Sequence, residues 1–309
     1  MKIKLARKFS LEDLGPAQYF LGVRITRDRN SKRLWLTQDA YCRQILERFG
    51  MENCHLAEIP MAQGYDVFMI PNTEQASRSE IKDYQSKIGS LLYLAVHTRP
   101  DISYSVSVFS RYLTNPSSNH IKGVDRVIRY IKGTINLGIM YDGNALDSTL
   151  YCFSDSDWGG NIATRRSTGG CVFFLAGGVV SASSKGQTNV ALSSTEAEYH
   201  ALTSSIQELL WIQQLMRQMR YSGNDVISTK VYGDNQSCLA LSENPELHQR
   251  TKHIDIKHHF IRDHIASGRV VPKYVPTNHM VADGLTKSLN KNKHENFVKM
   301  LNMKTAQMN

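Results

Sequence analysis

One acidic stretch, Tyr151-Cys-Phe-Ser-Asp-Ser-Asp-Trp158, combines alternating aromatic residues with carboxylates where a predicted strand ends. Residues two apart in a strand point to the same face of its sheet. Asp155 therefore shares a face with Tyr151 and Phe153, where an unpartnered carboxylate is costly to bury. We interpret Asp157 as a residue with a structural role or as one that supports this acidic group. The stretch thus predicts an acidic group that needs a partner at the end of a buried strand.

Three further acidic residues lie where predicted helices or strands begin or end: Glu198, Asp234 and Asp283. Glu198 precedes Leu202 by one helical turn, so it continues the apolar face of its helix. Taken singly, each acid could instead be a helix cap, with Thr195 and Glu198 forming a capping box. Capping does not account for four acids at four junctions, and converging carboxylates need a cation. An oxygen-only set favours Mg²⁺, with Mn²⁺ as a substitute, and two such ions are suited to phosphodiester hydrolysis.

The bulk composition points to a globular protein with an anionic partner. The 309 residues carry a formal net charge of +9, which favours nucleic acid as that partner. No apolar run approaches the roughly 20 residues of a membrane span, and the N-terminus lacks the apolar core of a signal peptide. We therefore expect an intracellular protein without a membrane partner. Its five scattered cysteines form no Cys-x-x-Cys pair and are expected to be reduced thiols.

The predicted elements after residue 148 are typical of an α/β domain in which helices cover a mixed sheet. They are a strand from Leu150 to Asp155, a hairpin over 171–184 turning at Gly177-Gly178, a helix from Thr195 to Met219 with an apolar face that ends at Met219, a strand from Thr229 to Gly233, a helix from Asn235, a helix from His253 to Ala266, a strand from Val270 to Val275 and a helix containing Asp283. The N-terminal half predicts a smaller α+β unit. Its elements are a hairpin of Tyr19–Ile25 and Arg33–Thr37, a helix from Gln38 to Phe49, a linker over 63–80, a helix begun by Pro100, and an amphipathic helix ended by Gly133.

Two groups of basic residues are candidates for contact with nucleic acid. The first group, Lys122, Arg126 and Arg129, recurs at helical spacing opposite an apolar helix face. Such a stripe is either a solvated face or a phosphate contact. The second group lies in the predicted His-rich helix and its approach: Lys252, Lys257 and Arg262.

The histidines of that region offer a rival metal site. They are His248, His253, His258, His259 and His264. Their spacing matches no zinc signature, and the interleaved cations would oppose Zn²⁺ binding. A basic helix that faces nucleic acid or solvent is the favoured interpretation.

Several motifs occur in one order along nearly the whole chain. They are Leu14-Gly-Pro-Ala-Gln-Tyr-Phe-Leu-Gly22, Gly89-Ser-Leu-Leu-Tyr-Leu94, Thr98-Arg-Pro-Asp-Ile102, Arg129-Tyr-Ile-Lys-Gly-Thr134, Ser154-Asp-Ser-Asp-Trp158, Ala191-Leu-Ser-Ser-Thr-Glu-Ala-Glu-Tyr199 and Lys252-His-Ile-Asp-Ile256. Together they resemble the C-terminal part of a Ty1/copia-type retrotransposon Pol polyprotein. The resemblance implies the end of a reverse transcriptase palm over 1–62, a helical thumb or connection over 63–140, an RNase H domain over 148–290 and a C-terminal tail over 291–309. The hairpin at Phe20-Leu21-Gly22 resembles the segment that grips the primer.

The same resemblance implies that Asp155, Glu198, Asp234 and Asp283 are the catalytic, metal-binding acids of an RNase H. Such an enzyme cleaves the RNA of an RNA–DNA hybrid endonucleolytically. Asp155 would bridge two Mg²⁺ ions roughly 3.5–4 Å apart. Glu198 and Asp234 would hold the ion that activates water, and Asp283 would complete the ion at the leaving oxygen.

Other parts of the family pattern differ in this chain. The polymerase motif Tyr-x-Asp-Asp is absent, so no polymerase activity is expected from this chain alone. The remainder of a Pol polyprotein is an expected partner, and the expected location is a cytoplasmic virus-like particle or the nucleus. Ala182 and Gly186 stand where the family usually has an aromatic and a basic residue, and Asp125 stands where a base is common. These departures leave a second function open, that of an inactive nucleic-acid-binding remnant.

Overall fold

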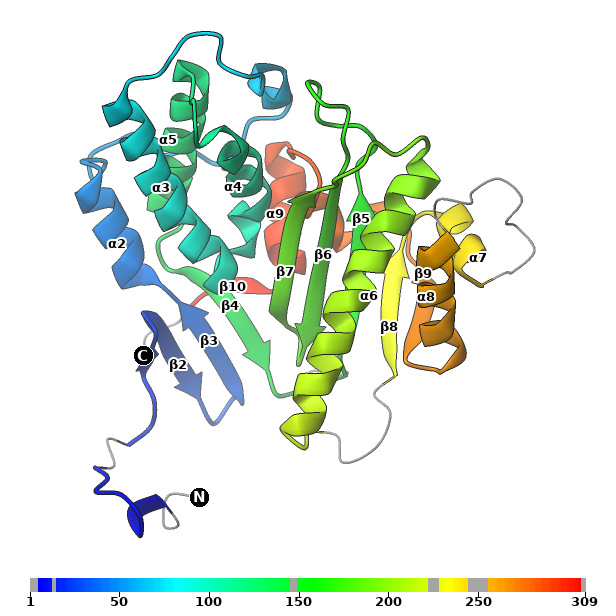
Figure 1. The fold of residues 1–309 in the computed structure, drawn as a ribbon. Coiled ribbons are helices and arrows are strands. Elements are labelled where there is room, and N and C mark those ends of the chain that lie inside the picture. The colour runs from blue at the N-terminus through cyan, green and yellow to red at the C-terminus, as the bar shows by residue number, and fades with distance from the viewer. Residues whose placement is uncertain (1–4, 13–14, 145–148, 222–227, 244–254, 307–309) are drawn as a thin grey trace.

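The computed structural model describes residues 5–12, 15–144, 149–221, 228–243 and 255–306. Two five-stranded sheets lie side by side, each accompanied by helices (Figure 1). The first sheet has the order β1-β2-β3-β4-β10, and the second has the order β7-β6-β5-β8-β9. The architecture is therefore the predicted mixed α/β class, with a mixed sheet and flanking helices in the second half.

The first sheet is antiparallel and joins both ends of the described chain. Its strands are β1 (Tyr19–Phe20), β2 (Val23–Asp28), β3 (Arg33–Thr37), β4 (Leu137–Asp142) and β10 (Met303–Thr305). The predicted hairpin is confirmed as β2 and β3, with Asp28 opposite Arg33. A second tight turn joins β1 to β2 through Leu21 and Gly22, both with positive φ. Strand β4 is not among the predicted elements, because only helices are expected between residues 81 and 140.

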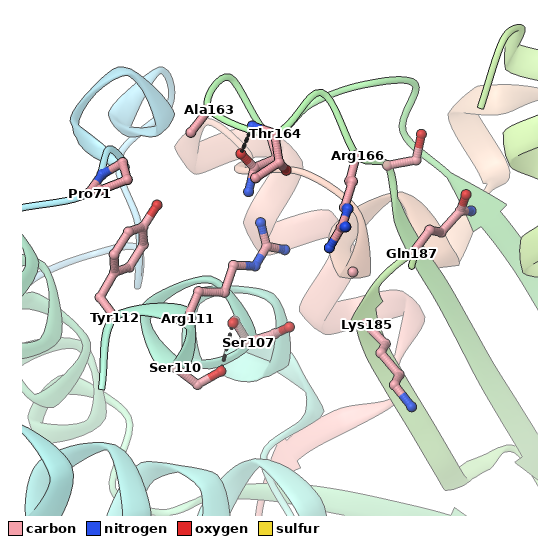
Figure 2. A pocket seen from close by; sticks show the side chains of 13 residues that line it. Pro71, Ser107, Ser110, Arg111, Tyr112, Ala163, Thr164, Arg166, Lys185 and Gln187 are labelled. Atoms are coloured by element: carbon pink, nitrogen blue, oxygen red, sulfur yellow. Dashed lines mark hydrogen bonds between the residues drawn. The ribbon is translucent and has the colours of Figure 1, made fainter. Parts of the chain in front are cut away.

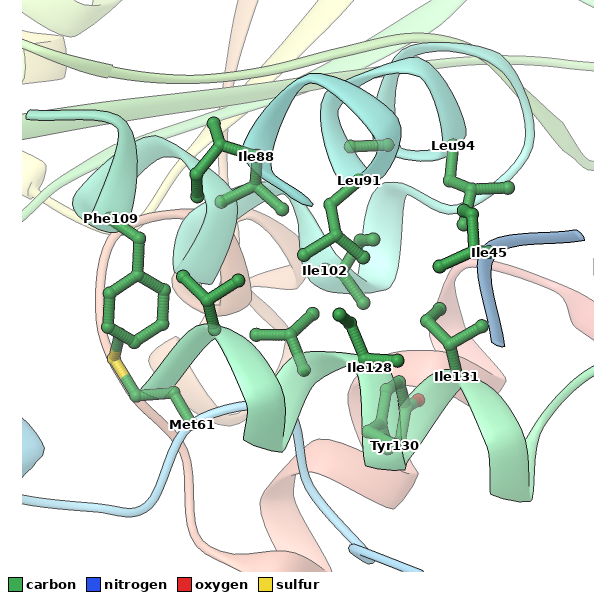
Figure 3. Close-up of a cluster of buried hydrophobic side chains, with 14 of the residues drawn as sticks. Ile45, Met61, Ile88, Leu91, Leu94, Ile102, Phe109, Ile128, Tyr130 and Ile131 are labelled. Carbon is green, nitrogen blue, oxygen red and sulfur yellow. The ribbon is translucent and has the colours of Figure 1, made fainter. Parts of the chain in front are cut away.

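The helices of the N-terminal half enclose a hydrophobic core of their own (Figure 3). They are α2 (Asp39–Arg48), α3 (Arg78–His97), α4 (Ser103–Phe109) and α5 (Ser118–Gly133), with short 3-10 turns η1 (Tyr65–Phe68), η2 (Pro100–Ile102) and η3 (Ser110–Tyr112). The predicted apolar face of α5 is confirmed, since Val124, Ile128 and Ile131 are fully buried. Pro100 begins η2 as expected, and α5 ends at Gly133.

The second sheet mixes antiparallel and parallel pairs. Its strands are β5 (Tyr151–Ser156), β6 (Thr168–Leu175), β7 (Gly178–Gly186), β8 (Thr229–Gly233) and β9 (Val270–Tyr274). β5, β6 and β7 are antiparallel neighbours, whereas β8 runs parallel to both β5 and β9. The hairpin turn lies at Ala176 and Gly177, one residue earlier than predicted. Both residues have positive φ, as a two-residue turn of this kind requires.

One face of the second sheet is covered by α6 (Ser194–Gln218), which crosses it in Figure 1. Leu202, Ile206 and Leu209 of α6 are buried in a core shared with β5 and β8. Met219 was predicted to continue this face but is 62% exposed, because the helix has already ended there. The helices α7 (Gln236–Glu243) and α8 (Asp255–Ala266) lie beyond β8 and β9 in the same view. None of the described helices combines the length and apolar character of a membrane span.

The segment 291–309, expected to be a tail, is part of the folded core in its described portion. It forms α9 (Lys291–Met300) and then β10, which pairs with β4. Phe297 and Leu301 are buried together with Phe174 of the second sheet. The physical reason is that burial of these apolar side chains is favourable, and they are buried against the face of the second sheet that α6 does not cover. The segment therefore fastens the two halves together.

Candidate metal centre

Three of the four predicted acids converge at one end of the second sheet. Asp155 lies near the end of β5, Asp234 directly follows β8, and Asp283 lies in the short 3-10 helix η7 (Val281–Leu285). One carboxylate oxygen from each lies within 4.8 Å of the others. β5 and β8 are adjacent and parallel, so their carboxyl ends lie together and bring the first two acids side by side. The helix predicted around Asp283 is thus only one short turn.

Each of these three carboxylates is held by a neighbour from the segment 277–287. Thr286 Oγ1 donates a 2.6 Å hydrogen bond to Asp155 Oδ2. Thr277 Oγ1 donates to Asp234 Oδ2 over 2.7 Å. Neither threonine is among the predicted site residues, because no local sequence pattern links them to strands more than 40 residues away.

A lysine also lies against the acids. Lys287 Nζ is 2.8 Å from Asp283 Oδ2. Burial alone would lower the pKa of Lys287, but its hydrogen bond to Asp283 and the nearby carboxylates raise it. The ammonium group therefore stays charged beside the cluster. Its spacing of four residues from Asp283 is the helical signal that could have identified it.

The fourth acid, Glu198, approaches from α6. Burial, followed by the charges of Asp155 and Asp234, raises the pKa of Glu198 to about 10. Helix capping does not explain this residue. The N-cap of α6 is Ser193, which accepts from the Glu196 backbone N–H, while Glu196 accepts from the Leu192 N–H. Glu198 is therefore left to face the other acids.

The electrostatics of the cluster would favour a bound cation. Burial and then the charge of Asp283 raise the pKa of Asp155 to about 7, despite the hydrogen bond from Thr286. Oxygen ligands alone, at least three of them carboxylates, suit a hard divalent ion such as Mg²⁺. Asp157, by contrast, accepts a hydrogen bond from the Thr168 backbone N–H, which ties it to β6.

The predicted basic residues lie elsewhere and have mixed surroundings. On α5, Lys122 is exposed, but Arg126 and Arg129 donate to the backbone carbonyls of Ile59 and His55. These two arginines therefore hold the segment before the linker. Arg262 is half-buried on α8. Lys252 and the side chain of Lys257 lie outside the described residues.

The rival histidine site finds no support among the described side chains. Among the described residues, the side chains that come close enough to hold a metal ion together are Asp155, Asp234 and Asp283. Burial lowers the pKa of His264, whose ring packs against Phe260. His248, His253 and the side chain of His258 lie outside the described residues. All five cysteines are free, as predicted.

Comparisons with known proteins agree with the motif pattern. No family model matches the sequence. Over 298 residues, 96% of this chain, the sequence is 39% identical to the retrovirus-related Pol polyprotein from transposon TNT 1-94 of Nicotiana tabacum, of which 22% is covered. A putative transposon Ty5-1 protein of Saccharomyces cerevisiae is 34% identical over 68% of this chain and 67% of its own length. The chain spans about a fifth of the length of the curated Pol polyproteins that it matches.

A solved structure of LC11-RNase H1, isolated from compost by a metagenomic approach, aligns with 45% of this chain and 94% of its own. Its sequence identity is 17% and its TM-score is 0.33. The sequence relationship is far closer and runs through nearly the whole chain. It establishes that the chain belongs to the family of copia/Ty1-type retrotransposon Pol polyproteins.

Proposed function

We propose that the second half of the chain is a ribonuclease H that hydrolyses the RNA strand of RNA–DNA hybrids and depends on Mg²⁺. The observation that supports this most is the convergence of Asp155, Asp234 and Asp283, with one oxygen of each within 4.8 Å of the others. These side chains come from three elements that are distant in sequence. The motifs quoted above, which imply an RNase H domain, assign the same acids.

The acids would divide the work by position. Asp155, the most buried of the three aspartates, would hold Mg²⁺ together with Asp234, Asp283 and the nearby Glu198. Bound Mg²⁺ would supply Lewis-acid stabilisation and a water of lowered pKa. The raised pKa values of Asp155 and Glu198 support this assignment, because a cation would offset the burial and the neighbouring negative charges that raise them.

The protein's own groups would orient these ligands. The hydroxyl of Thr286 holds one oxygen of Asp155, so the other oxygen is left to a cation. Thr277 does the same for Asp234. Lys287 balances part of the negative charge at Asp283 without covering all of its oxygens. Such supporting contacts restrict the carboxylates before a substrate arrives.

The N-terminal half is proposed as the end of a reverse transcriptase, with palm-end residues 1–62 and a thumb or connection over 63–140. Strand β4 extends two residues past that second boundary. We do not propose polymerase activity for this chain alone, since the Tyr-x-Asp-Asp motif is absent. The proposed partners are an RNA–DNA hybrid and the rest of a Pol polyprotein. The proposed location is a cytoplasmic particle or the nucleus.

The test is cleavage of a 5′-labelled RNA–DNA hybrid by the purified chain with Mg²⁺. Asp155→Asn and Asp234→Asn are expected to abolish cleavage, while the exposed Asp263→Asn on α8 is a matched control that retains it. Duplex DNA and single-stranded RNA should remain intact. Full metal-dependent cleavage by both site variants would refute the assignment. Hybrid binding by the folded parent without any cleavage would favour the inactive remnant instead.

A further inference from the structure

A pocket of about 500 Å³ opens where the N-terminal half meets the second sheet (Figure 2). One wall comes from α4 and η3 of the N-terminal half. The opposite wall comes from the loop after β5 and from the end of β7. Its polar lining includes Ser107, Arg111, Asn161, Arg166, Lys185 and Gln187. Neither half alone would form this pocket.

The charge in the pocket is of one sign. Arg111, Arg166 and Lys185 all line it and are exposed, and its lining contains no aspartate or glutamate. Figure 2 shows the guanidinium groups of Arg111 and Arg166 pointing into the same space from opposite walls. Among the described residues, no carboxylate forms an ion pair with any of the three cations. Two facing guanidinium groups favour an anion between them.

Arg111 reaches across the boundary between the two halves. Its Nη2 donates a 3.2 Å hydrogen bond to Thr168 Oγ1 on β6, which fixes the side chain across the boundary between the halves. A Cβ added to Gly186 would lie 3.7 Å from the same nitrogen. A guanidinium group from the N-terminal half therefore lies beside Gly186 at the end of β7.

The pocket is directly linked to the candidate metal centre. Gln187 lines the pocket, and its amide nitrogen donates to Ser156 Oγ over 3.0 Å and to the Ala197 carbonyl over 2.8 Å. Ser156 follows Asp155, and Ala197 precedes Glu198. A strand lying on the acids could therefore reach the pocket with its neighbouring phosphates.

We infer that this pocket binds a backbone phosphate of the nucleic acid, with Arg111 and Arg166 as its two main ligands. The inference rests on the proposed function, because it places an anchoring contact for the same substrate. The N-terminal half would supply one of those two ligands, Arg111. The guanidinium group suits phosphate because it presents two parallel N–H donors.

The experiment measures binding of a fluorescent RNA–DNA hybrid to the full chain by anisotropy, in EDTA and over a range of KCl concentrations. Arg166→Ala and Arg111→Ala should each weaken binding about tenfold, as loss of a hydrogen bond to a charged group does. Each should also lower the slope of log K against log salt by about one unit. The control, Arg217→Ala, removes an exposed charge near the far end of α6 and should change neither quantity.

Thermal unfolding separates a binding defect from a folding defect. Arg166 is exposed, so Arg166→Ala should melt like the parent. Affinity and salt slope equal to those of the parent in both arginine variants would overturn the pocket. So would a parent that does not bind hybrid. A parent that binds but does not cleave, with both variants weakened, would uphold the pocket and reject the nuclease; cleavage with unchanged binding by the variants would do the reverse.

Discussion

Replacing Asp155 with asparagine should stabilise the metal-free protein and should disrupt the proposed metal site. The folded state raises the pKa of Asp155 from 3.8 to about 7. At about 1.4 kcal/mol for each pKa unit, holding this carboxylate ionised costs about 4 kcal/mol. This net shift already includes the hydrogen bond from the Thr286 hydroxyl, and asparagine keeps an oxygen that can accept that bond. The expected gain is therefore about 4 kcal/mol.

The assay is thermal unfolding in EDTA at about pH 8, where the cost of ionisation is fully developed. A gain of about 4 kcal/mol should raise Tm by about 6 °C for a chain of this size. The folded pKa is raised, so the parent loses stability as pH rises from about 4 to about 7. The gap between variant and parent should thus close near pH 4. Asp263→Asn, an exposed acid on α8, is the control and should shift Tm little.

Addition of Mg²⁺ should then reverse the ranking. Metal binding to the folded state raises the Tm of the parent, whereas the variant has lost a central ligand and should respond weakly. An Asp155→Asn protein that melts at or below the parent Tm in EDTA at about pH 8 would refute the claim that burial and neighbouring acids disfavour the ionised Asp155 carboxylate. Equal Mg²⁺ responses would refute the claim that Asp155 is a ligand.

Three further predictions follow from other contacts. Lys287→Gln removes the ammonium group that competes for Asp283, so half of the Mg²⁺-induced rise in Tm should occur at a lower Mg²⁺ concentration; an unchanged midpoint would contradict this competition. Burial lowers the pKa of His294, so the stability that neutral His294 contributes is present above about pH 6.5 and is lost as the pH falls below that value. Between about pH 7.5 and 5.5, the Tm of the parent should therefore fall more than the Tm of His294→Gln. A Cβ at Gly123 would overlap the Phe109 ring, so Gly123→Ala should cost about 1–3 kcal/mol in urea unfolding. Gly89→Ala, in α3 with open space at its Cβ, is the matched control and should stabilise by about 0.5–1 kcal/mol.

Local periodicity predicted most of the elements around the site. β8 begins and ends at the predicted residues, and α6 lies within one residue of its predicted bounds. The reason is that strand alternation and the helical repeat are properties of neighbouring residues. Asp155 and Asp234 could be placed at strand ends for the same reason. Errors arose where the signal was short, as at η7 and β4.

The contacts that shape the site have no local signature. Thr286 meets Asp155 across 131 residues, and Arg111 meets Thr168 across 57. α9 lacks a strong apolar pattern, yet its His294 reaches the hydroxyl of Tyr130 at 2.9 Å and its Phe297 joins the core between the halves. Pairings of this kind depend on which faces remain uncovered after the elements have formed.

The sequence by itself determined the family, the class of fold and the four acids, because motifs and periodic patterns are written in consecutive residues. Only the tertiary structure decided that three of the acids share one space, that Thr286 and Lys287 hold two of them, and that Arg111 stands beside Gly186. It also decided that the C-terminal segment joins the two halves. The physical reason is that burial of apolar faces and pairing of charges are satisfied between distant segments, whose meeting no local pattern records.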